Sequence, residues 1–284
     1  MGFILNPYAH VPFVQPPVWA IEDFSYDTVS LVVGDKEINP QAVIFNDDGS
    51  KVYITGNSGA GRKIHEYSCA INYSLVGASF LQTTFNFGTQ SPSEPNPTAI
   101  RFKPGGLKAY AVGITNNTFY QYTLTTPYDT STMTKDASSF NAASIDNLIL
   151  GFDISPDGTK LLFTGLQHTK IYSLTFDTPW DISTLSDDAK SFNYATEDTV
   201  QQELQLHPNG FSLYTTGSTN DRVYRYLMSS KNDPSTITPD GFISVSSNSN
   251  NEPRGMIITP DGQRMIVVND KAGATSALDQ YSIV

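Results

Sequence analysis

Cysteine, histidine and long apolar runs are scarce in this chain. One cysteine among 284 residues excludes an intramolecular disulfide, and four scattered histidines disfavour a structural zinc site, which needs clustered Cys and His ligands. No run approaches the ~18 apolar residues that span a membrane. Lys and Arg number 17 against 28 Asp and Glu, which gives a net charge of −11. That charge argues against nucleic acid, whose phosphates need cationic partners.

A turn that recurs along nearly the whole chain is the most informative feature present. Its third copy reads Pro156-Asp157-Gly158, and Asp-Gly or Asn-Gly pairs are typical of tight hairpins because they tolerate positive φ. The final glycines are separated by 57 residues and then three times by 52; they are Gly49, Gly106, Gly158, Gly210 and Gly262. A fixed period of this size indicates a repeat architecture.

Each repeat predicts four short strands. Alternating apolar runs stand before and after the turn, and large apolar side chains two residues apart indicate strands. A third segment is rich in tyrosine, and a fourth centres on Phe80, Phe140, Phe192 or Phe242. Four antiparallel strands in about fifty residues are typical of a propeller blade. The expected fold class is therefore all-β, a five-bladed β-propeller.

The two ends of the chain predict how the ring closes. The fifth repeat ends after its third strand, and residues 21–28 match residues 189–196 in pattern. The N-terminal strand is thus expected to complete the last blade, which leaves no gap between the first and last blades. A solenoid is the alternative, but it needs terminal caps and not a divided repeat. The propeller domain is expected over residues 18–284.

Residues 1–17 precede the repeats and contain four prolines. We expect them to form an extended arm, in polyproline II or irregular conformation. Two alternatives stay open: the arm packs on its own domain, or it docks onto a neighbouring subunit. The segment lacks a basic stretch, and its apolar run is too short for a signal peptide.

The third repeat resembles a family of propeller repeats with the motif PDGTK…TG…Y…TPWDIST…SF. Residues 156–160, 164–165, 178–185 and 191–192 carry the likeness, which extends over about residues 18–284. Such repeats occur in bacterial surface proteins and in virion and tail proteins of tailed phages. The resemblance implies a propeller fold and a location on a virion, with an extracellular or cell-surface location as the alternative.

Motifs for a nucleophile elbow, a phosphate-binding loop or a dinucleotide site are absent from the sequence. We therefore expect no catalytic residue, cofactor or metal, and no enzyme. The leading hypothesis is a non-enzymatic structural or tail protein of a phage virion, acting as an interaction or receptor-contacting propeller. Its expected partners are other virion proteins, in an oligomeric assembly, and a host glycan or receptor, without membrane insertion. A glycan-binding, lectin-like module is the alternative, and a glycoside hydrolase is a third hypothesis.

Polar residues expected near the axis form one candidate site. The innermost strands carry small residues there, but Glu203 breaks this rule, and Arg101 and Asp153 take equivalent places on adjacent blades. One interpretation is an axial polar site for a sugar or a cation. The other is an inter-blade ion pair in a hydrated channel. A glycosidase would need paired acids of set separation at this place.

Irregular loops form the second candidate site. Loops between strands 2 and 3, and between strand 4 and the next blade, share one face and differ among repeats. The Pro-Asp-Gly and TPWDIST turns share the other face and are uniform, which indicates a structural role. Loops on a rigid scaffold often carry recognition, with ordinary solvated loops as the alternative. The binding residues expected there are Asn96, Asn117, His168, Asn220, Asp221 and Asn250.

Overall fold

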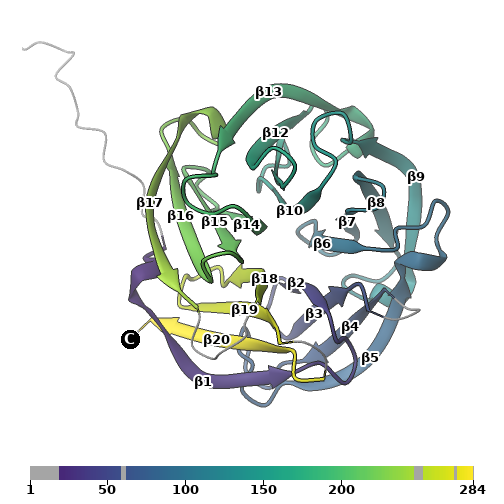
Figure 1. Cartoon of the computed structure of the whole chain (residues 1–284). Helices are drawn as coiled ribbons and strands as arrows, with labels where there is room; N and C mark the ends of the chain where they lie inside the picture. The colour runs from purple at the N-terminus through teal and green to yellow at the C-terminus, as the bar shows by residue number, and fades with distance from the viewer. Residues whose placement is uncertain (1–18, 59–61, 246–251, 272–273, 284) are drawn as a thin grey trace, which may run out of the picture.

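Five antiparallel four-stranded sheets stand around a central axis in the computed structural model of this chain (Figure 1). The structure describes residues 19–58, 62–245, 252–271 and 274–283. This confirms the all-β, five-bladed propeller, whereas the expected arm of residues 1–17 lies outside the described part. In the described residues, no helix is long and apolar enough to cross a membrane.

The strands of each blade are numbered here from the axis outward. Blade 1 contains β2 (Pro40–Phe45), β3 (Lys51–Gly56), β4 (Lys63–Ser68) and β5 (Ser79–Asn86). Blade 2 contains β6 (Pro97–Phe102), β7 (Lys108–Gly113), β8 (Thr118–Leu124) and β9 (Met133–Asn141). Blade 3 contains β10 (Ile149–Ile154), β11 (Lys160–Gly165), β12 (Lys170–Phe176) and β13 (Leu185–Asn193). Blade 4 contains β14 (Gln201–Leu206), β15 (Ser212–Gly217), β16 (Arg222–Met228) and β17 (Ile237–Ser244). Blade 5 contains β18 (Glu252–Ile258), β19 (Arg264–Asp270), β20 (Ala277–Ile283) and β1 (Phe24–Val32).

The N-terminal strand β1 closes the ring by pairing antiparallel with β20, from Phe24 opposite Ile283 onward. This confirms the predicted closure, but the match of residues 21–28 with 189–196 was wrong. The 3-10 turn η1 (Ile21–Asp23) and β1 take the places that η4 (Ile182–Thr184) and β13 hold in blade 3, so residue 24 corresponds to residue 185. This correspondence could not be recognised from the sequence, because little of the TPWDIST motif remains before β1.

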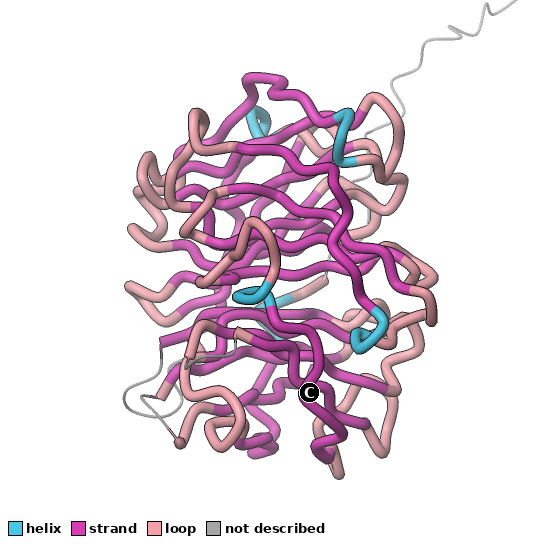
Figure 2. The backbone as a smooth tube through the Cα atoms, turned by 90° about the vertical axis from the view of Figure 1, so that its right-hand side faces the viewer, coloured by secondary structure: helices cyan, strands magenta, loops and turns pink. Residues whose placement is uncertain are grey.

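Turns and loops gather at two opposite faces of the propeller, with the strands running between them (Figure 2). We call the face with the strand 1–2 and strand 3–4 turns the turn face, and the opposite face the loop face. Two further 3-10 turns, η3 (Thr130–Thr132) and η5 (Pro234–Thr236), precede strand 4 of blades 2 and 4 as η4 does in blade 3, and η2 (Phe87–Thr89) follows β5.

The recurring glycines lie beneath large side chains on the turn face. Gly158 has a φ of 72°, and a Cβ there would lie 2.1 Å from the Trp180 ring. The Trp180 N–H donates to the Gly158 carbonyl at 3.0 Å, so the two turns of blade 3 are joined. The pairing recurs as Gly49 with Tyr73, Gly106 with Tyr128 and Gly262 with Trp19. Both the positive φ and the aromatic contact require glycine, and this accounts for the repeated turn structurally.

Amide side chains in the middle of strand 3 bind neighbouring blades together. Gln121 of β8 accepts a hydrogen bond from the Ile182 N–H of blade 3 at 3.3 Å and donates to Asp136 at 2.6 Å. Gln280 of β20 makes equivalent contacts where blade 5 meets blade 1. It accepts a hydrogen bond from the Leu75 N–H at 2.7 Å and donates one to a carboxylate of β1. The closing junction is thus hydrogen-bonded like an internal one.

Candidate functional site

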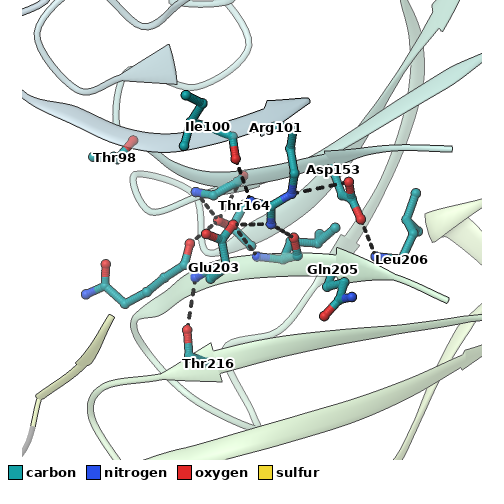
Figure 3. Close-up of polar contacts among 12 residues, drawn as sticks. Thr98, Ile100, Arg101, Asp153, Thr164, Glu203, Gln205, Leu206 and Thr216 are labelled. Atoms are coloured by element: carbon teal, nitrogen blue, oxygen red, sulfur yellow. Dashed lines mark hydrogen bonds and ion pairs between the residues drawn. The ribbon is translucent and has the colours of Figure 1, made fainter. Parts of the chain in front are cut away.

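Arg101 of β6 joins three consecutive blades near the axis (Figure 3). Its Nη2 lies 2.9 Å from Glu203 Oε1 on β14, and its Nε lies 3.3 Å from Asp153 Oδ1 on β10. The guanidinium also donates to the carbonyls of Ile100 and Leu204, at 2.8 Å each. The structure therefore brings the three predicted axial residues together as an inter-blade ion-pair network.

The close approach of the innermost strands makes this network possible. A Cβ on Gly151 of β10 would lie 2.4 Å from the Gln202 carbonyl and 2.6 Å from Glu203 Cα. Because glycine stands there, β10 packs directly against β14. Glu203 is thereby held within reach of an arginine that lies two blades away.

Burial governs the protonation of the network. The Glu203 side chain is 1% exposed, and burial raises its pKa to about 7 against the opposing attraction of Arg101. Burial likewise raises the pKa of Asp153, opposed by Arg101 and by the N–H groups of Leu206 and Ile154. Burial alone would lower the pKa of Arg101, but the two carboxylates outweigh it and raise that pKa. Glu203 thus exchanges its proton near neutral pH.

The free energy of unfolding should fall as the pH rises from about 4.5 to about 7. The folded-state pKa of Glu203 lies above its ordinary 4.5, so the folded chain binds more protons than the unfolded chain in this window. Glu203→Gln should remove this part of the slope, as urea denaturation at several pH values would measure. Glu252→Gln, at a side chain 60% exposed, is the control. A Glu203→Gln slope equal to that of the control would contradict the assignment.

A cavity of about 240 Å³ opens beside the network on the turn face. Arg101 and Asp153 line it, and the Asp153 side chain is 17% exposed. Aromatic side chains from several blades form much of the remaining wall, among them Trp19, Tyr73 and Phe102. Apolar walls with a few converging polar groups are typical of small-molecule sites.

The other end of the axis is filled by side chains. Five residues at equivalent places in the innermost strands line a space with no room for a water molecule; they are Gln41, Thr98, Leu150, Gln202 and Arg254. Glu203 contacts this plug and does not line the cavity on the turn face. The cavity is therefore blind, and a ligand in it would meet Arg101 and Asp153 but not Glu203.

Asp47 supplies an exposed carboxylate at the cavity. It belongs to the strand 1–2 turn of blade 1, and its Oδ2 accepts the Gly105 N–H of blade 2 at 2.8 Å. Gln205 also lines the cavity, but it already exchanges two hydrogen bonds with the main chain of Ile258, at 2.9 and 2.7 Å. Asp47 and the exposed part of Asp153 are thus the acidic acceptors offered to a ligand. Within the described residues, no group of three His, Cys, Asp or Glu side chains is arranged to hold a metal ion.

On the loop face, buried carboxylates tie the loop entering a blade to its strand 2–3 loop. Asp198 accepts hydrogen bonds from the N–H groups of Val200, Thr219 and Asn220, at 2.9, 3.3 and 3.1 Å. Gly217 makes room, because a Cβ there would lie 2.3 Å from that carboxylate. We call these acids the loop clamps; the others are Glu37 beside Gly56, Glu94 beside Gly113 and Asp146 beside Gly165. Sequence reasoning missed them.

Three of the predicted loop residues lie beside these clamps. The His168 side chain is half exposed, and its Nδ1 lies 3.2 Å from Asp146 Oδ2. The Asn220 side chain is exposed and donates to the carbonyl of residue 197 at 3.0 Å. Asn96 donates to the Thr115 hydroxyl at 2.8 Å. These side chains have loop-stabilising partners within their own blade.

Two of the other predicted loop residues have a left-handed backbone conformation. Asn117 and Asp221 have φ values of 49° and 50°. Asn117 is buried, and its Oδ1 accepts the Ile149 N–H at 3.1 Å. Asn250 lies outside the described residues. The described members of this set lie on the loop face, so they do not converge with the axial cavity.

No protein-family model matches the chain, and no curated protein matches it. Solved structures do resemble it. A luciferin-regenerating enzyme is 11% identical with a TM-score of 0.50, over 86% of this chain and 77% of that one. The periplasmic gluconolactonase of Pseudomonas aeruginosa is 13% identical with a TM-score of 0.46, over 86% and 70%. A protein of unknown function from Desulfotomaculum acetoxidans is 15% identical with a TM-score of 0.47, over 81% and 62%.

These comparisons correct one prediction from the sequence. The expectation that the chain is not an enzyme is contradicted by a similar structure that is named for an enzyme, the luciferin-regenerating enzyme. The chain spans 62–64% of the length of three similar structures. At these identities the likeness shows the fold alone: the chain is similar to β-propellers, among which enzymes occur.

Proposed function

We propose that this chain is a receptor-contacting propeller that binds a saccharide unit in its axial cavity. The blind cavity on the turn face is the observation that carries this proposal. Its volume of about 240 Å³ lies below the ~300–1,000 Å³ of pockets that enclose drug-sized ligands. A ligand of about one sugar ring therefore suits it better than a longer chain lying wholly inside.

The chemistry of the wall supports a saccharide. Sugar rings present C–H faces that pack on aromatic rings, and Tyr73 and Phe102 offer such rings while remaining only partly buried. Sugar hydroxyls donate hydrogen bonds, and the carboxylates of Asp47 and Asp153 accept them. Hydrogen bonds to a charged group contribute about 1.5–3 kcal/mol. The net charge of −11 favours a neutral sugar at this acidic site over an anionic one.

We further propose that the protein works on the particle of a tailed phage, beside other virion proteins. The likeness of residues 156–192 to the PDGTK and TPWDIST repeats supports this placement. The genes that flank its coding sequence test it. Tail and capsid genes on either side would support the placement, and a neighbourhood without any virion gene would count against it.

Asp47→Asn should weaken saccharide binding at least tenfold. The change keeps the size of the side chain but removes the charged acceptor, and a tenfold loss corresponds to about 1.4 kcal/mol. A glycan array would identify the ligand, and isothermal titration would then compare the variant with the native chain. Asp35→Asn is the matched control, since Asp35 is exposed and does not line the cavity.

Two results would overturn the saccharide proposal. One is the absence of binding across a broad glycan array. The other is a ligand that binds the native chain and Asp47→Asn with equal affinity, because such a ligand would not occupy the axial cavity.

A further inference from the structure

A second cavity, of about 360 Å³, lies away from the axis on blade 4. Strands β16 and β17 form its floor, and β17 is the outermost strand of that blade (Figure 1). Thr196 and Glu197, from the segment that links blade 3 to blade 4, form one wall. The predicted loop-face residues do not line it, and the axial cavity shares no lining residue with it.

A stacked arginine is the distinctive element of this cavity. The guanidinium carbon of Arg222 lies 3.8 Å from the centre of the Phe242 ring, so the cation rests against the ring face. Phe242 is nevertheless 49% exposed, although it is a large apolar side chain. The Tyr224 ring lies beside it, with the two ring centres 6.0 Å apart. An oriented cation and an accessible aromatic surface thus adjoin each other.

The charges around the cavity are unequally compensated. Arg225 is held by two carboxylates, Glu22 at 2.7 Å and Asp240 at 2.5 Å. Arg222 has no carboxylate within 4.0 Å among the described residues. The remaining acid, Glu197, accepts a hydrogen bond from the Thr196 hydroxyl through Oε1, and its Oε2 is buried without a hydrogen-bond partner in the described part of the chain. Arg222 is therefore the cation in this cavity whose charge is still available to a ligand.

The repeat shows that this arrangement is not part of the scaffold. Phe242 stands opposite Tyr224 in the β16–β17 pairing. At the equivalent place the other blades have small hydroxyl residues, which are Thr83, Ser139, Ser191 and Ser30. Blade 3 has a cation where blade 4 has Arg222, namely Lys170, but Ser191 gives it no aromatic ring at that place. A blade of this fold forms without the stacked pair, so the fold does not account for its presence in blade 4.

We propose that this cavity binds a saccharide that carries a carboxylate, such as a uronic acid. The planar guanidinium of Arg222 presents parallel N–H donors that match both oxygens of a carboxylate. The exposed part of Phe242 packs against the C–H face of the sugar ring, and the Phe242 contact keeps the guanidinium oriented before the ligand arrives. This site is separate from the axial cavity, and it does not depend on the function proposed there.

Titration of the full chain with glucuronic acid, followed by NMR chemical-shift changes at low salt, tests the proposal. We expect glucuronic acid to bind and neutral glucose not to bind at this cavity. Arg222→Gln should weaken the binding of the uronate at least tenfold, and Phe242→Ala should weaken this binding as well. Lys170→Gln, the matched cation of blade 3, and Asp47→Asn, at the axial cavity, should leave uronate binding unchanged.

Three outcomes would overturn the proposal. If an Arg222→Gln variant of native thermal stability bound the uronate with unchanged affinity, Arg222 would have no part in binding. Acetate binding as tightly as glucuronic acid would exclude recognition of the sugar ring. Loss of uronate binding in Asp47→Asn alone would place the ligand in the axial cavity instead.

Discussion

Arg101→Met should lower the free energy of unfolding by about 3–5 kcal/mol, the cost typical of removing one partner of a buried ion pair. The variant leaves the carboxylates of Asp153 and Glu203 without their cation, and water hardly reaches Glu203, whose side chain is 1% exposed. It also removes the donor that the carbonyls of Ile100 and Leu204 share. Since Arg101 spans blades 2, 3 and 4, the loss acts on two blade junctions together.

Urea denaturation followed by circular dichroism measures this effect. Lys231→Met is the control, because the pair of Lys231 with Asp157 is solvent-exposed and surface pairs contribute about 0–1 kcal/mol. At a pH at which Glu203 is ionised, adding Glu203→Gln to the Arg101→Met variant should restore part of the stability, since it removes one uncompensated charge. A double variant no more stable than Arg101→Met would show that charge is not the cause.

Asp198→Ala should destabilise the chain by about 3 kcal/mol. The carboxylate accepts three partly buried backbone N–H groups on the loop face, and hydrogen bonds to a charged group contribute about 1.5–3 kcal/mol each. Water that enters the vacated space offsets part of this cost. Urea denaturation gives the total, and hydrogen exchange at Thr219 and Asn220 should accelerate locally before the ring unfolds.

Two further variants make the Asp198 prediction specific. Asp198→Asn keeps one acceptor oxygen and should lose less stability than Asp198→Ala. Asp177→Ala, at an exposed acid, should change stability by no more than ~0.5 kcal/mol. If Asp198→Ala behaved like Asp177→Ala, the clamp would not hold the loop face together.

The fold was readable from the sequence because its strongest signal is local. Asp-Gly turns, period-2 strands and a divided repeat each follow from short stretches of chain, and together they predict five blades and their closure. The register of the closing strand was not readable, because the turn before β1 keeps little of the motif that marks this turn in blade 3. Tertiary pairing with β20 decides that register.

The axial network was predictable because a repeat converts sequence position into spatial position. Arg101 and Asp153 occupy the same place in successive blades, so their proximity follows from the ring. The cavity beside them was not predictable, since Asp47, Phe102 and other wall residues meet only when separate blades converge. The same reason explains the mistaken exclusion of an enzyme: groups that converge from different blades leave no local motif, so a motif search cannot exclude them.

The loop clamps had a signal that sequence reasoning passed over. Their acids are separated by 57, 52 and 52 residues, the same intervals as the turn glycines, and each precedes its partner glycine by 19 residues; they are Glu37, Glu94, Asp146 and Asp198. Glutamate stands at this position in blades 1 and 2 and aspartate in blades 3 and 4, so a search for identical residues does not find the repeat. A search for acidic residues at a fixed interval, and not for identical residues, would have found the loop clamps.

The pairing of β1 with β20 also has a consequence for the order of events during synthesis. Residues 24–32 leave the ribosome before any blade exists, yet their partner strand, residues 277–283, is the last strand of the propeller to be made. Blades 1 to 4 each consist of consecutive strands and can form in turn as the chain emerges. Contacts between distant parts of a chain form slowly, because a long loop must close first. The first strand of the propeller must therefore remain unpaired until residues 277–283 have been translated.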